Sequence, residues 1–172
     1  MPSKLYFHNT ANDQPGTYPT GEQSARTADA TWTDANTLRK MGTAIGAAQV
    51  STSLAIARGT ANRNEFIRFY ASPPLEGAQT VGGGTATLNC ADAESNTNAN
   101  FWIDSITVYV WRPSTGVLVG MLRDAVDLGG AEPTAVNDEQ VTTFNFTTTA
   151  VSAADGDVVI CEIWANFTQG MT

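Results

Sequence analysis

The chain has 172 residues, of which 42% are hydrophobic and 9% aromatic, which is enough apolar surface for one folded domain and too much for a disordered chain. Nine Lys and Arg against seventeen Asp and Glu give a formal net charge of −8 without a basic cluster, so we expect no nucleic-acid partner. No apolar run of about 18 residues occurs, and the N-terminus lacks the apolar stretch of a signal peptide, so we expect no membrane partner.

The first part of the chain is expected to be an extended segment. Residues 9–24 are rich in Asn, Gly, Pro and Thr, which favour turns and extended backbone over helix. Around this polar stretch stand hydrophobic side chains that would be costly to leave in water, namely Leu5, Tyr6, Phe7 and Trp32. We therefore predict an N-terminal arm, residues 1–40, that packs on a neighbouring subunit, followed by a β-sandwich domain, residues 41–172.

Three strands are predicted in the middle of the chain. Residues 41–58 mix Ala and Leu with Thr, Val, Ile and glycine, and we interpret them mainly as strand. Residues 65–72 are dense in aromatic and branched side chains and are followed by Pro73, which cannot donate to a β-ladder. Residues 85–91 follow three consecutive glycines and are predicted as a further strand.

The clearest strand signals lie in the C-terminal half. Residues 101–112 alternate at period two, and the turn at residues 113–116 leads into a strand at 117–123, which predicts a hairpin. Residues 140–147 and 158–167 are also predicted as strands, the last with one apolar face and one mixed face.

Together with the short run at residues 5–7, these segments amount to about eight strands. No convincing amphipathic helix accompanies them, and Gly, Pro and Asn separate them. The pattern predicts an all-β fold, specifically an antiparallel, jelly-roll-like β-sandwich with an extended N-terminal segment.

Few residues are candidates for metal binding or nucleophilic catalysis. The only histidine, His8, lies in the N-terminal segment, so we expect neither a Ser/His/Asp nor a Cys/His mechanism. One His and two distant Cys cannot form a zinc site, and the segment from Asp92 to Asn98 lacks the remaining features of a calcium loop. We expect no metal and no organic cofactor. Cys90 and Cys161 lie in apolar runs, where buried free thiols are the better interpretation.

Two carboxylates and two tryptophans carry alternative interpretations. Asp104 and Glu162 lie in strands otherwise rich in apolar residues, so they are candidates for a glycosidase pair. The preferred alternative is that strand alternation places both charges in solvent. Trp102 and Trp164 lie opposite the better apolar stripe or at its margin, which is equally consistent with an interface and with the core.

Four segments together resemble small structural proteins of tailed bacteriophages. They are FYASPPL at residues 69–75, ADAESNTNAN at 91–100, TVYVWRPSTG at 107–116 and DGDVVICEIWANF at 155–167. The resemblance implies a β-sandwich subunit of the virus particle, such as a decoration, cement, collar or tail-associated protein that works in multiple copies. It also implies assembly in the cytoplasm of the bacterial host, and it supplies no catalytic residues.

The first hypothesis is therefore a non-enzymatic virion structural protein, specifically a capsid decoration or cement subunit. Its expected partners are copies of itself, as a homo-oligomer, and other virion proteins of the capsid or tail. The alternative is a carbohydrate-binding or receptor-binding β-sandwich module of a phage fibre, and a glycosidase built on Asp104 and Glu162 is a third. The residues expected at interfaces are Leu5, Tyr6, Phe7, Trp32, Trp102 and Trp164.

Overall fold

The computed structural model describes residues 4–20, 23–24, 30–31, 38–43, 63–92, 99–127 and 140–169. All helical or extended structure assigned within these ranges is β-strand, which confirms the predicted all-β class. No helix in the same ranges is long and apolar enough to cross a membrane.

Eleven strands lie within the described residues. In chain order they are β1 (Tyr6–Ala11), β2 (Ala30–Thr31), β3 (Arg39–Gly42), β4 (Arg63–Ala71), β5 (Gln79–Val81), β6 (Thr85–Asp92), β7 (Ala99–Arg112), β8 (Val117–Asp127), β9 (Gln140–Thr147), β10 (Val151–Ala153) and β11 (Val158–Gln169). The long strands coincide with the predicted ones. β2, β5 and β10 have no predicted counterpart, because two or three residues are too few to show alternation.

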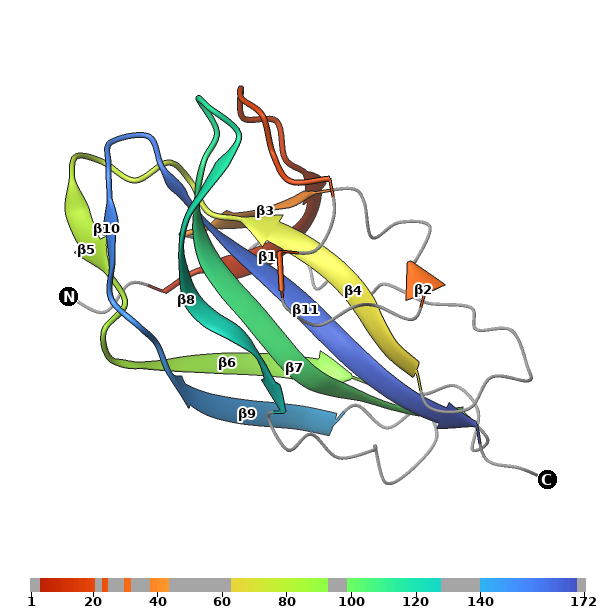
Figure 1. Cartoon of the computed structure of the whole chain (residues 1–172). Coiled ribbons are helices and arrows are strands. Elements are labelled where there is room, and N and C mark those ends of the chain that lie inside the picture. The colour runs from red at the N-terminus through yellow and green to blue at the C-terminus, as the bar shows by residue number, and fades with distance from the viewer. Residues whose placement is uncertain are drawn as a thin grey trace.

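A large sheet forms the centre of the molecule (Figure 1). Its strands follow the order β1-β3-β4-β11-β7-β8, and β2 also pairs with β4. β11 pairs antiparallel with β4 on one side and β7 on the other, whereas β2 and β3 run parallel to β4. Two small antiparallel sheets, β6–β9 and β5–β10, complete the set. Because a jelly roll divides eight strands between two sheets, the predicted jelly-roll topology stays a prediction.

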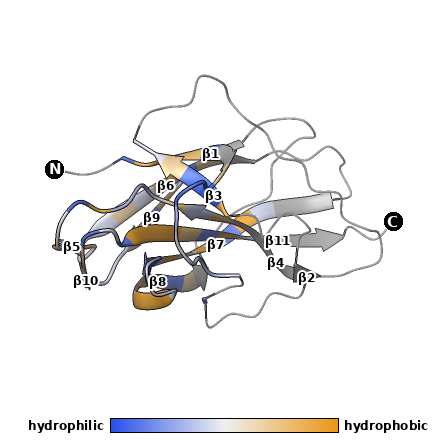
Figure 2. Ribbon diagram, turned by 90° about the horizontal axis from the view of Figure 1, so that it is seen from above, coloured by the Kyte–Doolittle hydropathy of each residue, from blue (hydrophilic) through white to orange (hydrophobic). Residues whose placement is uncertain are grey.

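The inner face of the large sheet packs against the β6–β9 ribbon. The cluster between the two layers contains Met41, Leu88, Ile103, Ile106, Phe144, Phe146, Cys161 and Ile163. A smaller cluster of Val110, Leu122 and Ala153 joins β7, β8 and β10. Figure 2 shows hydrophobic stretches, in orange, in strands of both layers. The interior between the layers is therefore an ordinary apolar core.

The outer face of the large sheet is buried as well. Its cluster contains Phe69, Ala71, Tyr109, Trp111, Val158, Ile160 and Trp164, and two side chains of the N-terminal segment, Tyr18 and Leu38, pack against it. In β11 the alternate residues Val158, Ile160, Glu162 and Trp164 are all 0% exposed. The prediction of a mixed outer face for residues 158–167 was therefore incomplete, because the N-terminal segment covers that face.

The described part of the N-terminal segment lies on the chain's own sheet. β1 pairs with β3, and β3 pairs with β4. The predicted boundary at residue 40 thus falls inside a strand of the large sheet. That the segment also packs on a neighbouring subunit stays a prediction. Trp32 and the predicted strand beyond Thr43 lie outside the described residues.

A sheet buried on both faces predicts that substitutions on either face of β11 are costly. Ile160→Ala on the outer face and Ile163→Ala on the inner face should each lower the free energy of unfolding by about 2–5 kcal/mol. The control is Val141→Ala, since Val141 is 69% exposed and its loss should change stability by less than about 0.5 kcal/mol. Urea unfolding measures all three variants. If Ile163→Ala were costly but Ile160→Ala mild, the outer face would not be covered as described.

Candidate functional site

The most unusual chemical feature of the core is a buried carboxylate at the centre of the outer face. Glu162 is 0% exposed and lies in β11 between Phe69 of β4 and Thr107 of β7. The backbone N–H of Gln23 donates to Glu162 Oε1 at 2.8 Å. A buried carboxylate needs hydrogen-bond donors to offset its lost hydration. Glu162 therefore binds the N-terminal segment to the sheet.

A second acidic side chain holds the next residue of the same segment. Ser24 Oγ donates to Asp124 Oδ1 at 2.7 Å, and Asp124 Oδ1 also accepts the backbone N–H of Ala125 at 2.8 Å. Asp124 lies in β8 and Glu162 in β11, so consecutive residues of the segment are bound to two different strands. This pair of contacts fixes the path of the segment across the sheet.

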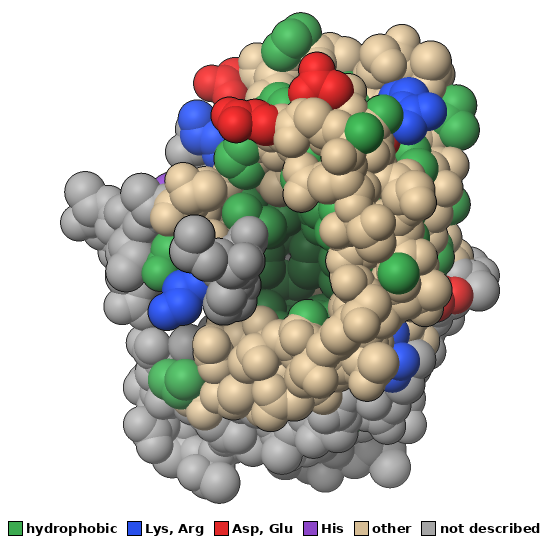
Figure 3. Space-filling model, turned by 90° about the vertical axis from the view of Figure 1, so that its left-hand side faces the viewer, with side chains coloured by type: hydrophobic (Ala, Val, Ile, Leu, Met, Phe, Trp, Pro, Cys, Tyr) green, Lys and Arg blue, Asp and Glu red, His purple; other side chains and the backbone are tan. Residues whose placement is uncertain are grey.

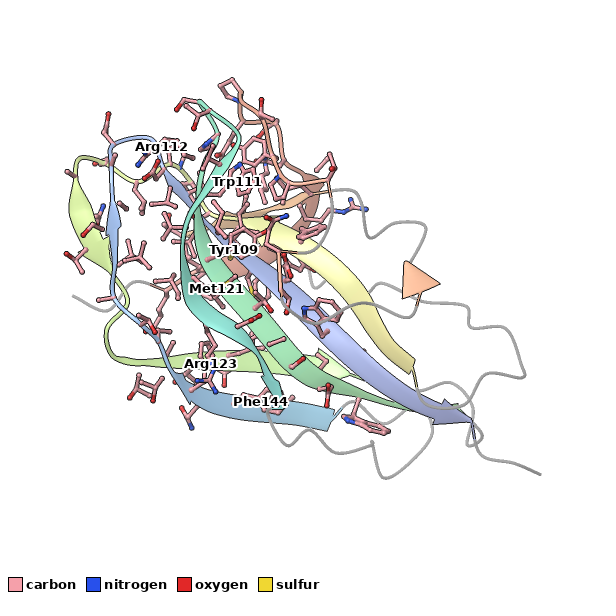
Figure 4. The ribbon with its side chains drawn as sticks, viewed as in Figure 1. Tyr109, Trp111, Arg112, Met121, Arg123 and Phe144 are labelled. Carbon is pink, nitrogen blue, oxygen red and sulfur yellow. The ribbon has the colours of Figure 1, made fainter. Side chains whose placement is uncertain are left out.

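Tyr109 lies close to Glu162 on the outer face. Burial raises the pKa of Tyr109 far above its ordinary value, and the neighbouring charge of Glu162 raises it further. The hydroxyl of Tyr109 lies near that carboxylate. The ring packs edge-on against Trp111, with centroids 6.3 Å apart and an interplanar angle of 70°. Figure 4 labels both rings on β7 and places Met121 of β8 near Tyr109.

The N-terminal segment is hydrogen-bonded to the end of β7 and to the turn between β7 and β8. Trp111 Nε1 donates to the carbonyl of Thr17 at 2.7 Å, and the Thr17 N–H donates to the carbonyl of Pro113 at 2.8 Å. Gly16 has a φ of +133°, and a Cβ there would lie 2.5 Å from Pro113 Cβ, so only glycine fits. We call residues 14–17 and 113–116 the paired loops; both reach the top of Figure 1.

A bidentate ion pair between Arg112 and Asp157 stabilises the end of β7 that leads into this turn. Arg112 Nε and Nη2 donate to the two carboxylate oxygens of Asp157, each at 2.8 Å. Asp157 also accepts the N–H of Ala154 at 2.8 Å and is 1% exposed. The hydrogen bond from Arg112 holds the pKa of Asp157 below its usual range. The pair joins the end of β7 to the turn that precedes β11.

The structure buries both carboxylates that were considered for a glycosidase. Asp104 is 6% exposed and Glu162 is 0% exposed, so the expectation that alternation puts them in solvent was wrong. The N-terminal segment covers Glu162 on the outer face. Asp104 is the extra residue of a bulge in β7, opposite Trp164 and Ala165 of β11, so it departs from regular alternation. A sugar reaching Glu162 would first have to displace Gln23 from Oε1.

The predicted interface residues divide into several environments. Leu5 is 37% exposed, whereas Tyr6 and Phe7 are half-buried and Phe7 packs on Tyr70 with ring centroids 4.4 Å apart. Trp102 is half-buried and Trp164 is 0% exposed. Of the two alternatives given for Trp164, the structure therefore shows the core.

Residues considered for metal or thiol chemistry lie in structural positions. Cys90 and Cys161 are free thiols, and burial, followed by the charges of Glu162 and Cys90, raises the pKa of Cys161 to about 12. His8 is half-buried, and its ring lies so close to Gly42 that a Cβ there would be 2.6 Å from Nε2. Among the described residues, no three His, Cys, Asp or Glu side chains gather as metal ligands. Most of the segment from Asp92 to Asn98 lies outside those residues.

Several exposed features were not predicted from the sequence. Figure 3 shows a hollow with hydrophobic walls, on the side of the molecule that is at the left of Figure 1. A hollow of this kind can accept a hydrophobic side chain or ligand. Val117 and Leu118, at the start of β8, are 53% and 36% exposed. Their signal in the sequence was a hydrophobic pair directly after a turn, which usually indicates a strand and does not reveal its exposure.

The buried hydroxyl of Tyr109 predicts a loss of stability in alkali. The unfolded chain releases this proton near pH 10, whereas the folded chain retains it, so unfolding becomes more favourable as the pH rises above about 10. Tyr109→Phe should reduce the slope of the free energy of unfolding against pH, by about 0.7 kcal/mol per pH unit at pH 10 and by up to about 1.4 kcal/mol per pH unit where the unfolded tyrosine is fully ionised. Urea unfolding between pH 9 and 11 measures it, and equal slopes for both chains would contradict the burial of this hydroxyl.

The lowered pKa of Asp157 predicts a loss of stability in acid, whereas Tyr109 predicts a loss in alkali. Its stabilising effect is present above the ordinary carboxyl pKa of about 4 and is lost as the pH falls through the lowered value. Asp157→Asn should therefore be less stable than the natural chain at pH 7, and the difference should shrink in acid. Arg112→Lys keeps the positive charge but not the two parallel hydrogen bonds, and should fall between the two in thermal unfolding.

Comparisons with known proteins add no relative to this description. No protein-family model matches the chain, no curated protein is detectably similar to it, and no solved structure matches its fold.

Proposed function

We propose that the chain is a non-enzymatic structural subunit of a tailed-phage particle, of the capsid decoration or cement type, that binds copies of itself and other virion proteins. The observation that carries the proposal is the exposed hydrophobic pair Val117 and Leu118 beside the paired loops. Interfaces need apolar side chains that leave water on association. The resemblance of the four sequence segments to phage structural proteins is the reason for choosing a virion as the assembly.

The paired loops are well suited to present such a contact. Gly116 has a φ of +68°, and a Cβ there would lie 2.9 Å from Thr17 Cγ2, so the two loops are in close contact. The hydrogen bond from the Thr17 N–H to the Pro113 carbonyl restricts the conformations of the two loops before any partner binds. A surface that is already ordered loses less conformational entropy on binding. Val117 is thus held at a fixed place next to the N-terminal segment.

The charge of the chain indicates what kind of surface it would meet. A formal charge of −8 favours encounter with a basic patch on a shell or tail protein and disfavours direct contact with nucleic acid. Leu5, which precedes β1, is 37% exposed and offers a second apolar contact at the opposite edge of the large sheet. Two separate contacts on one subunit are what a repeating assembly requires. Assembly would then take place in the cytoplasm of the host.

The proposal predicts that a charge at Val117 weakens assembly. Val117→Asp should lower self-association at least tenfold in sedimentation velocity, and should reduce recovery of the subunit in purified particles of the virus that encodes it. The matched control is Val141→Asp, because Val141 is 69% exposed but lies on the β6–β9 ribbon. Thermal unfolding of both variants should stay near that of the natural chain, since both side chains are exposed.

Two results would contradict different parts of the proposal. Normal assembly of the Val117→Asp chain would show that the paired loops are not the contact surface. A natural chain that stays monomeric and is missing from purified particles would show that the virion role itself is wrong.

A further inference from the structure

A regular ladder of polar side chains covers the outward face of the β6–β9 ribbon. The register pairs Thr85 with Thr147, Thr87 with Asn145 and Asn89 with Thr143, and all six side chains are exposed. The intervening residues Leu88, Phe144 and Phe146 point the other way, into the core. We call these six residues the Thr/Asn ladder. It was visible in the sequence as Thr and Asn at every second position of two predicted strands.

Hydrogen bonds between the strands fix the orientation of the two amides in the ladder. Thr87 Oγ1 donates to Asn145 Oδ1 at 2.8 Å, and Thr143 Oγ1 donates to Asn89 Oδ1 at 2.7 Å. Each Asn therefore uses its oxygen within the ladder and presents its NH2 group, with two donors, to solvent. Each Thr hydroxyl that donates keeps lone pairs that can accept. The ladder thus offers ordered donors, acceptors and Thr methyl groups on one surface.

The absence of charge on the Thr/Asn ladder indicates which kind of ligand it can bind. None of its six side chains is ionisable, although the chain as a whole carries a formal charge of −8. Anionic ligands gain no ion pair on this face and are repelled by the rest of the protein. Its six side chains include none of the Trp, Tyr and Arg that dominate protein–protein hot spots, which disfavours a second copy as its partner. The exposed Val141, two residues before Thr143 in β9, adds a hydrophobic side chain at one end of this face. A neutral ligand with many hydroxyl groups matches these properties.

We infer that the Thr/Asn ladder is a binding face for neutral glycans, with the NH2 groups of Asn89 and Asn145 as donors to sugar hydroxyl oxygens. This inference does not depend on the proposed virion role. Trp164, one of the predicted interface residues, is completely buried and is not available to stack on a sugar. Because the ladder is exposed and its donors stay in contact with water, we expect each glycan to be bound weakly.

The test is nuclear magnetic resonance of the 15N-labelled full chain titrated with three neutral probes: cellohexaose, maltohexaose and chitotetraose. At least one probe at millimolar concentration should shift the side-chain NH2 signals of Asn89 and Asn145 in a saturable way. Sialyllactose serves as the anionic comparison and should bind more weakly. The double substitution Thr87→Val and Thr143→Val removes the hydroxyls that orient the amides but keeps the shape of the strands, and should weaken binding at least threefold.

The matched control is Thr149→Val, an exposed threonine outside the ladder, which should bind as the natural chain does. Thermal unfolding of the double variant shows whether the ribbon is still folded, and the single variants Asn89→Ala and Asn145→Ala provide a second route if it is not. The inference is overturned if no neutral probe shifts either amide, or if the shifts map to other residues. It is also overturned if the amide signals move with protein concentration alone, because the ladder would then be a self-association surface.

Discussion

β11 lies between β4 and β7 and has fully buried side chains on both faces, so the large sheet needs a cover on each side. The β6–β9 and β5–β10 ribbons cover the inner face through an apolar core. On the outer face the cover includes the N-terminal segment, which contributes Tyr18 and Leu38 to the core, whereas its stretch from residue 9 to residue 24 is largely polar. Such a polar segment can be buried only where its backbone groups find partners, and Glu162 provides one of these at the centre of the sheet.

This arrangement explains why one segment is joined to the sheet by such different interactions. Tyr18 supplies apolar contact, Trp111 donates to the backbone of Thr17, and Glu162 accepts from the backbone of Gln23. No single contact of this kind is worth more than a few kcal/mol, but each satisfies a group that burial would otherwise leave at a cost. The N-terminal segment therefore belongs to the fold, whatever further contacts it makes.

Much of the fold could be predicted from the sequence because strand alternation is a local property. Residues 140–147 show it within one strand, and their bounds agree with β9. The burial of Glu162 could not be predicted in this way, since it depends on Gln23, which is 139 positions away along the chain. The same holds for Trp164, whose core position follows from a cover that alternation cannot reveal. The exposure of Val117 was missed for the opposite reason, because nothing covers a residue that its pattern marks as apolar.

The strand order has a consequence for how the chain acquires its fold during synthesis. β4 and β7 are separated by β11, the last of the described strands to leave the ribosome, so the centre of the sheet is completed only after residue 158 has emerged. Until then two partial sheets expose the edges that β11 will later join, and such edges are where nascent chains aggregate or exchange strands. Insertion of a distant strand also requires closure of a long loop, which slows folding. The time for which these edges stay unpaired is therefore set by how long residues 158–169 take to be synthesised and to pair.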